Sequence, residues 1–436
     1  MLSAFAQAFR TPDLRKKLLF TLVIIGLFRL GSVIPTPGVS YTAIQTCLNQ
    51  VGNDTTYQLI NLFSGGALLQ LSIFALGIMP YITSSIIVQL LVVVIPRFEA
   101  LKQEGQAGTA KLTQYTRYLT VGLAVLQSTA LIAVARNPGT LFPSCNQDLI
   151  PNESTWVIVT MVVTMTAGTA VIMWLGELIT DRGIGNGMSI LIFTSIIARF
   201  PAQIWTIYQV KHGFAFGVVI LLGLALVTLV VFIEQAQRRI PVQYAKRMVG
   251  RRMYGGTSTY IPLKVNMAGV IPVIFASSLL YIPYLLVQLF GNQQNPTGWA
   301  AWVTENFIRN GGAHPLYILA YFGLIMFFCY FYVAITFNPE EVADNMKKYG
   351  GFIPGIRAGR PTAEYLDYVL TRLTFPGSLY LGVIAVLPII ALALLSASGQ
   401  FPFGGTSILI MVGVGLDTVK QIQSQLQQRN YEGFLR

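Results

Sequence analysis

The hexapeptide GIMPYI at residues 77–82 recurs, with small changes, as GVIPVI at residues 269–274. Each copy lies in or beside a long apolar stretch. A second pair follows in the same order, GMSILI at residues 187–192 and GTSILI at residues 405–410. Two matches with the same half-to-half correspondence favour duplication over the chance recurrence of short apolar strings. The sequence therefore predicts an internal duplication.

The composition places both copies in a membrane. The 436 residues are 54% hydrophobic and 11% charged, with a mean hydropathy of +0.61, whereas soluble domains carry about 25% charged residues. A spanning helix needs about 20 apolar residues. Ten stretches meet that need: about 18–34, 77–95, 115–135, 156–179, 188–208, 214–233, 265–289, 316–337, 375–395 and 406–419. An apolar piece at about 62–74 is too short to span and is expected to be re-entrant.

The ten spans divide into two halves of five, residues 1–213 and 214–436. Because five is odd, the halves must enter the membrane with opposite polarity, which makes an inverted repeat. Such proteins place their functional path at the interface between the halves. The predicted fold class is an all-α polytopic membrane protein.

The cations are distributed unevenly between the two sides. With the N-terminus in the cytoplasm, 24 of the 29 Lys and Arg residues fall inside, four fall outside and Arg29 lies within the first span. The positive-inside rule then predicts that both termini are cytoplasmic. Two long basic loops, 235–264 and 338–372, face the same side, and loops of this length usually have a function.

Aliphatic residues mark the predicted interface. Ile82 and Ile86 share one helix face, Gln89 continues it, and Ile274 is followed by Ser277. A narrow aliphatic ring offers ions no ligand and dewets, so it blocks ion flow. Mid-span carboxylates, which a secondary transporter with an inverted repeat usually needs, are missing. The chemistry favours a channel and leaves the transporter as the alternative; taken singly, any one isoleucine is more often lipid-facing.

The motifs of several enzyme classes are absent. There is no Gly-Lys of a P-loop, no His-Glu-x-x-His and no Gly-x-Ser-x-Gly, so we expect no catalysis, no metal and no cofactor. The sequence has three cysteines, Cys47, Cys145 and Cys329. Whether Cys47 and Cys145, both on the predicted outer side, form a disulfide is left open by their spacing.

Five longer motifs resemble those of the SecY family, the pore-forming subunits of bacterial protein translocases. They are IPTPG at 34–38, SIFALGIMPYI at 72–82, WLGE at 174–177 with RGIGNG at 182–187, PLKVNMAGVIP at 262–272 and PGIR at 354–357. The resemblance runs over nearly the whole chain. Ala358 stands where the family pattern leads us to expect proline.

The resemblance implies a central pore closed by an isoleucine ring and a short external plug. The ring would consist of Ile82, Ile86, Ile196, Ile274 and Ile410. The internal repeat alone would pair Ile192 with Ile410. The plug segment, defined as residues 62–70, would include Leu62, Phe63, Ser64, Gly65, Gly66, Ala67 and Leu68.

The resemblance also implies a lateral gate between spans two and three on one side and seven and eight on the other. Gln89, Gln127, Asn266 and Ser277 would line this gate, with a polar contact between Asn266 and Gln127.

The implied function is the passage of unfolded, signal-bearing polypeptides across the bacterial plasma membrane and the release of membrane helices through the gate into lipid. Arg251, Arg252 and Arg357 would dock the SecA motor or the ribosome, since arginine suits bidentate contacts with phosphate or carboxylate. Small SecE and SecG subunits are the implied permanent partners.

Overall fold

Apolar helices dominate the structure, a computed structural model. It describes residues 9, 11–50, 66–136, 147–152, 154–210, 214–244, 247–249, 252–254, 258–290, 298–308, 314–394 and 405–434. Within this part of the chain, helices cover all ten predicted spans: α2 (Pro12–Val33), α5 (Met79–Val94), α7 (Gln106–Ala135), α9 (Thr155–Arg182), α10 (Gly187–Val210), α11 (Phe214–Gln235), α12 (Ile271–Phe290), α14 (Pro315–Thr336), α16 (Arg360–Leu394) and α17 (Gly405–Phe434).

Four of these helices in the described chain, α7, α9, α14 and α16, are long and apolar enough by themselves to cross a membrane. A fifth span is possible if α5 is joined to the short α6 (Pro96–Gln103), from which it is bent by 100°. Shorter apolar segments lie in α10, α11 and α12. Several helix ends differ from the prediction: α16 begins at Arg360 and α17 continues to Phe434, because amphipathic turns extend both helices beyond their apolar cores.

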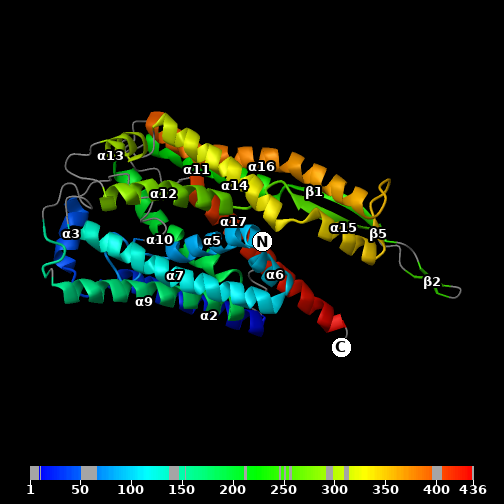
Figure 1. Cartoon of the computed structure of the whole chain (residues 1–436), viewed down its shortest axis with the longest axis horizontal. Coiled ribbons are helices and arrows are strands. Elements are labelled where there is room, and N and C mark those ends of the chain that lie inside the picture. Colours follow the sequence, from blue (N-terminus) through cyan, green and yellow to red (C-terminus); the bar gives the residue numbers. More distant parts are fainter. Residues whose placement is uncertain are drawn as a thin grey trace.

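The helices form two groups with a central layer between them. Figure 1 shows α2, α7 and α9 on one side and α11, α14 and α16 on the other, with α5, α10, α12 and α17 between. Contacts agree with this arrangement: α7 packs on α5 and α9, α14 packs on α12 and α16, and α10 pairs with α17 across the middle.

The duplicated motifs have the same structure in both halves. Gly77 and Gly269 have positive φ values of 56° and 61°, which glycine adopts readily, and each precedes the start of its helix, α5 or α12, by two residues. Gly187 and Gly405 each begin a helix against a backbone carbonyl of the preceding one, that of Gly176 in α9 or Ile384 in α16. These local similarities support the predicted duplication.

The close approach of each of these two glycines to a backbone carbonyl can be tested by substitution. Gly187→Val and Gly405→Val are each expected to lower the melting temperature of the purified protein, because the new side chain would meet a rigid backbone carbonyl. Overpacking typically costs about 1–3 kcal/mol. Gly122→Val in α7 is the matched control, since a β-carbon there meets nothing within 4 Å. Equal melting temperatures for all three variants in a thermal-shift assay would contradict the packing argument.

The two basic loops contain strands that the sequence analysis did not predict. β1 (Gln237–Tyr244) and β4 (Ser258–Lys264) form an antiparallel hairpin, with a smaller hairpin, β2 (Arg247–Val249) and β3 (Arg252–Tyr254), between them in the chain. β5 (Gly351–Phe352) pairs with β1 and joins the second loop to the first. Buried Ile240 and Val242 alternate with exposed positions along β1, so one face of the hairpin packs on the protein.

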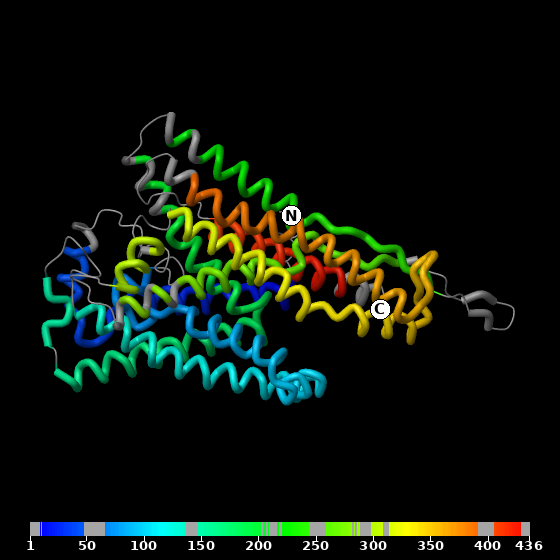
Figure 2. Tube along the Cα trace, turned by 45° about the horizontal axis from the view of Figure 1, so that its top comes forward, coloured from blue at the N-terminus to red at the C-terminus, as the bar shows by residue number. Residues whose placement is uncertain are grey.

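Segments predicted to share a side gather at one end of the molecule. The hairpin, α6 and α15 (Pro339–Lys348) lie at the end where the smaller hairpin projects, whereas α3 (Tyr41–Gln50) and α13 (Trp299–Val303) lie at the opposite end (Figures 1 and 2). A π-helical turn, η1 (Thr304–Ile308), follows α13. This separation agrees with the alternation of predicted inside and outside loops.

Candidate functional site

A buried aliphatic cluster joins the two halves at the centre of the bundle. It combines side chains of α2, α9 and α10 with Ile274 of α12 and Ile410 and Val414 of α17. Both motif pairs of the internal repeat contribute to it. The cluster is therefore the place where the duplicated elements meet, as the repeat predicted for a functional path.

Four of the five predicted ring isoleucines belong to this cluster. Ile196, Ile274 and Ile410 are buried, and Ile82 is a half-buried side chain packed against them. Ile192, the alternative partner from the repeat, is also buried here. Ile86 is half-buried one turn further along α5 and is not part of the cluster.

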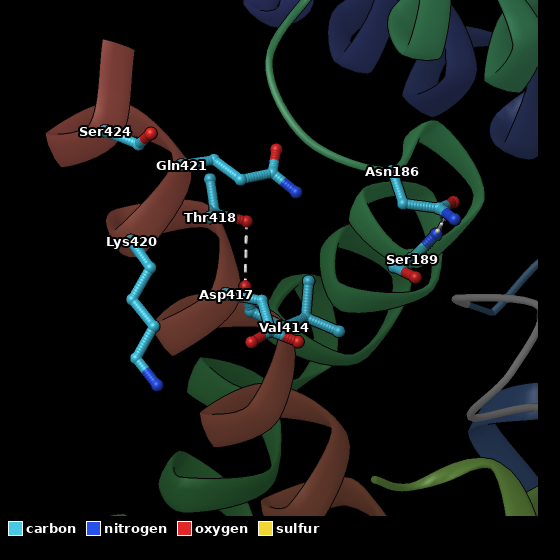
Figure 3. Close-up of a pocket in the computed structure, with 8 residues that line it drawn as sticks. All are labelled: Asn186, Ser189, Val414, Asp417, Thr418, Lys420, Gln421 and Ser424. Carbon is cyan, nitrogen blue, oxygen red and sulfur yellow. Dashed lines mark hydrogen bonds between the residues drawn. The ribbon is translucent and has the colours of Figure 1, made fainter. Parts of the chain in front are cut away.

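A polar pocket opens beside the cluster. Its volume is about 400 Å³, and it lies between the start of α10 and the middle of α17 (Figure 3). Asn186 and Ser189 line one wall and Asp417, Lys420 and Gln421 the other. Val414 belongs both to the pocket wall and to the aliphatic cluster, so the pocket adjoins the cluster at this residue.

The pocket walls are held by local hydrogen bonds. The side chain of Asn186 accepts from the backbone N–H of Met188 at 3.1 Å and of Ser189 at 3.4 Å, which caps the start of α10. Thr418 donates to the carbonyl of Val414 at 2.7 Å.

The predicted plug segment is described from Gly66 onward; Leu62, Phe63, Ser64 and Gly65 lie outside the described residues. Turns run from Gly66 to the start of α5, and Ala67 and Leu68 are buried. The chain beyond them is fixed to α2: the N–H of Ile73 donates to the carbonyl of Ile34 at 3.0 Å, and Phe74 stacks on Phe28.

The predicted gate residues Gln89, Gln127 and Ser277 lie on α5, α7 and α12. In the described chain α12 of the C-terminal half contacts both α5 and α7, and this boundary is called the seam. Ser277 of α12 donates to the carbonyl of Ile274 at 2.9 Å. Gln89 of α5 is exposed and 3.5 Å from Ser85, and Gln127 of α7 is half-buried. The role of these residues in a lateral gate stays a prediction.

Asn266 makes different contacts from those expected. Its amide donates to Oε1 of Glu234 at 2.6 Å and to the carbonyl of Gly269 at 3.2 Å, while its own Oδ1 is buried without a partner. The expected contact with Gln127 is not formed in this structure. Asn266 precedes α12 and binds the end of α11, because burial of Glu234 demands a hydrogen-bond donor.

An ion pair between α7 and α9 was missed by the sequence analysis. Arg117 holds Glu177 through two bonds of 2.8 and 2.9 Å. Glu177 belongs to the WLGE motif, so the motif carries a structural contact between spans three and four. Both residues lie near the same predicted side of the membrane, and pairing of opposite charges at adjacent helix ends was the available signal.

Of the three predicted docking arginines, Arg357 is described in full. Its side chain is exposed, and the loop that carries it has left-handed glycines on either side, Gly355 and Gly359. Thr362 donates to the carbonyl of Arg357 at 2.8 Å, which ties the loop to the first turn of α16. Arg252 lies in β3, whose side chains are not described, and Arg251 lies outside the described residues.

Solved structures with this arrangement are channels. One described as the structure of a protein conducting channel matches with a TM-score of 0.64 and 18% identity, over 94% of this chain and 91% of that chain. Sec61 in the canine ribosome–channel complex from the endoplasmic reticulum matches with a TM-score of 0.61 and 17% identity over the same shares. These matches show that the chain has the fold of those proteins.

Sequence relatives give the family. The SecY family model matches residues 72–419. The protein translocase subunit SecY of Streptomyces scabiei is 69% identical and that of Mycobacterium bovis is 60% identical, each over the full length of both chains. The chain belongs to the SecY family.

Proposed function

We propose that this chain is the central pore subunit of a protein translocase and conducts unfolded, signal-bearing polypeptides across the bacterial plasma membrane. The observation that carries the proposal is the aliphatic cluster, to which both halves contribute isoleucines. Aliphatic side chains pack against any passing residue and bind none of them. A ring of this kind suits a pore that must seal around varied sequences and still exclude ions.

The polar pocket supports an entry route. Polypeptide backbones carry obligatory hydrogen-bonding groups, and the pocket beside Val414 presents amide, hydroxyl and charged side chains before the apolar centre begins. A chain is solvated up to that point and then crosses a short apolar constriction. In this proposal residues 1–213 and 214–436 are the two halves, and the plug segment of residues 62–70 lies beyond the ring.

The seam along α12 supports lateral release. The seam is formed by α12 with α5 and α7, and a signal sequence with an apolar core of about 7–15 residues would partition through it into lipid. Gln89, Gln127 and Ser277 would line the opening; Asn266 would act at its edge, through α11.

The exposed basic loops at one end of the molecule are the surface on which we expect binding partners. A ribosome is bound to the structurally similar Sec61 channel in one of the matched structures. We propose that the loop of Arg357 and the neighbouring hairpin with Arg251 and Arg252 dock either a ribosome or a SecA-type ATPase, and that SecE and SecG accompany the chain. The channel itself supplies no energy in this proposal.

Reconstitution tests the function. The purified complex is placed in vesicles with SecA and ATP, and protease protection of a signal-bearing precursor is followed. Protection that needs ATP, SecA and the signal sequence supports the proposal. No protection under any condition with an intact complex would contradict it and would direct attention to a small solute.

Cys47 supports the proposed orientation. It is buried and disulfide-bonded in α3, Cys329 is free, and the sequence has three cysteines. We infer that Cys145, which lies outside the described residues, is the partner. Disulfides persist outside the cytoplasm, so α3 would be external and both termini cytoplasmic.

Thiol counting checks the disulfide. The protein is isolated in membranes without reductant, denatured and labelled with a maleimide. It is expected to take up one tag, at Cys329, before reduction. It is expected to take up three tags after reduction, since all three cysteines of the chain are then free. Cys329→Ser is the control and should take up no tag before reduction. Three tags without reduction would contradict both the pairing and the orientation drawn from it.

A further inference from the structure

The short helix α13 and the π-helical turn η1 lie at the end of the molecule opposite the β1–β4 hairpin (Figure 1). They pack against the two helices that they connect along the chain, α12 and α14. Ala300 of α13 faces the protein and is 3% exposed, whereas Trp299 and Trp302 are 53% and 56% exposed. Because the two tryptophans are three residues apart, α13 presents both on one face.

A series of ring contacts fixes the level of Trp302 along the bundle. Its ring centroid lies 5.9 Å from that of Phe307, and Phe307 lies 6.3 Å from Tyr317. Hydrogen bonds in a π-helical turn join residues five apart, so the turn brings Phe307 next to Trp302. Tyr317 is the third residue of α14. Trp302 therefore lies near the level at which the apolar span of α14 begins.

The surface of α14 shows what surrounds this level. Only 28% of the most apolar stretch of α14 is buried inside the protein, and Leu316 and Leu319 of its first turns are exposed. Lipid tails are as apolar as leucine, so acyl chains cover such a surface on a spanning helix. η1 packs on this helix, at the end where acyl chains give way to headgroups.

The side chains of α13 and η1 suit that boundary. An indole ring combines an apolar body with one N–H donor, and tryptophan is enriched where acyl chains meet headgroups. The segment becomes polar immediately afterwards: Glu305 is exposed, and the amide of Asn306 donates to the carbonyl of Trp302 at 2.8 Å. A short segment with an exposed aromatic face followed by polar residues has the amphipathic character of an interfacial helix.

We propose that α13 and η1 form a membrane-surface anchor, with the rings of Trp299 and Trp302 among the lipid headgroups. The occupant of this exposed face is the bilayer itself, because the face continues the lipid-covered surface of α14. The inference goes beyond the proposed function and does not depend on whether the chain conducts polypeptides. The anchor fixes the depth at which the ends of α12 and α14 lie in the membrane.

The ring contacts also continue inward from the anchor. Tyr317 stacks on Tyr321 with 6.0 Å between the ring centroids, and the hydroxyl of Tyr321 is 3.2 Å from Oγ1 of Thr406. Thr406 is the second residue of α17, four positions before Ile410 of the aliphatic cluster. A continuous series of contacts thus joins the lipid surface to a helix that contributes to the centre of the bundle.

Fluorescence quenching by lipid tests the anchor. The chain has five tryptophans; one variant has all five replaced by phenylalanine, and a second keeps Trp302 alone. The purified complex is reconstituted in phosphatidylcholine vesicles whose acyl chains carry bromine either near the headgroup or near the chain end. After subtraction of the tryptophan-free background, Trp302 is expected to lose most of its fluorescence to the bromine near the headgroup and less to the bromine near the chain end.

Tyr349→Trp in the tryptophan-free chain is the matched control. Tyr349 is 78% exposed beyond α15, at the opposite end of the molecule, so its tryptophan should respond to acrylamide in water and not to brominated lipid. For Trp302, stronger quenching from the chain ends would place the ring in the hydrocarbon core. Quenching by acrylamide alone would place it in water, and quenching by neither would mean that another subunit or a second copy covers it. Each of these three results would overturn the anchor.

A simpler comparison applies if the fivefold replacement does not fold. Wild-type complex and Trp302→Phe are measured in the same vesicles. Bromine near the headgroup is expected to quench a component of the wild-type fluorescence that Trp302→Phe lacks. Equal quenched components in the two proteins would overturn the anchor and would leave the proposed function untouched, since precursor transport is measured separately.

Discussion

Replacing Ile196 and Ile410 together by serine is expected to raise the ion conductance of the resting channel by an order of magnitude or more. The two residues come from opposite halves and are 2% and 0% exposed within the same aliphatic cluster. Hydroxyl groups at these positions bind water, and a constriction that no longer dewets passes ions. Planar-bilayer recording without precursor measures the effect.

The control for this double variant is Ile325→Ser in α14. Ile325 is also fully buried, but it belongs to the core of the C-terminal half and not to the central cluster. Truncating a buried Ile or Leu typically costs about 2–5 kcal/mol of stability, so both variants are expected to melt earlier. Only the ring variant should leak. Ion-tight Ile196→Ser/Ile410→Ser channels would show that the seal lies elsewhere.

Arg357→Glu is expected to abolish most SecA-driven protection of precursor. The side chain is exposed on a loop held by Gly355, Gly359 and the hydrogen bond from Thr362. Reversing its charge therefore changes the proposed docking surface without disturbing buried packing. Removing one partner of a desolvated charge pair at an interface costs about 2–5 kcal/mol, which corresponds to a loss of affinity of about 30-fold or more. The protease-protection assay and a SecA binding measurement both report it.

Arg360→Glu is the matched control three residues away. Arg360 is exposed on the same segment, but it pairs with Glu364 of its own helix at 3.1 Å. Exposed pairs of this kind contribute about 0–1 kcal/mol, so little change in transport is expected. Equal losses in the two variants would mean that general basicity of this surface, rather than the Arg357 loop, governs docking.

The sequence predicted the positions of the helices well because their signal is local; in the described chain four of them, or five with the bent pair of α5 and α6, are long and apolar enough to cross a membrane. An apolar run of about 20 residues specifies a span without reference to any partner, and every predicted span has a helix in the described chain. The meeting of Ile82, Ile274 and Ile410 was also predictable, because a repeated motif carries information about its counterpart. The repeat pointed to Ile192 as the fourth member and the family resemblance to Ile196, and both are buried in the cluster. Ile86, placed in the ring by resemblance, is half-buried outside the cluster, and its role stays a prediction.

Features that depend on distant pairing were not predictable. The two residues of β5 form a strand only because they pair with the edge of β1. The pairing of Tyr244 with Gly351 produces no alternation of apolar and polar residues in either loop from which it could have been predicted. Asn266 was assigned to the wrong neighbour because its hydrogen-bond partner, Glu234, lies 32 positions earlier. The Arg199 side chain lies close to Gly66, and neither local sequence indicates that the two residues meet.

The length of α16 has a mechanical consequence. Its 35 residues begin three positions after Arg357 and run to Leu394, a rod of about 50 Å at 1.5 Å per residue. It packs along α14 and α17, so a load applied at its tip is shared by the whole C-terminal half. In the proposed function, a motor that docked at the Arg357 loop would push on one end of α16, and the force would pass to α14 and α17 and reach the N-terminal half through α12, which contacts α5 and α7.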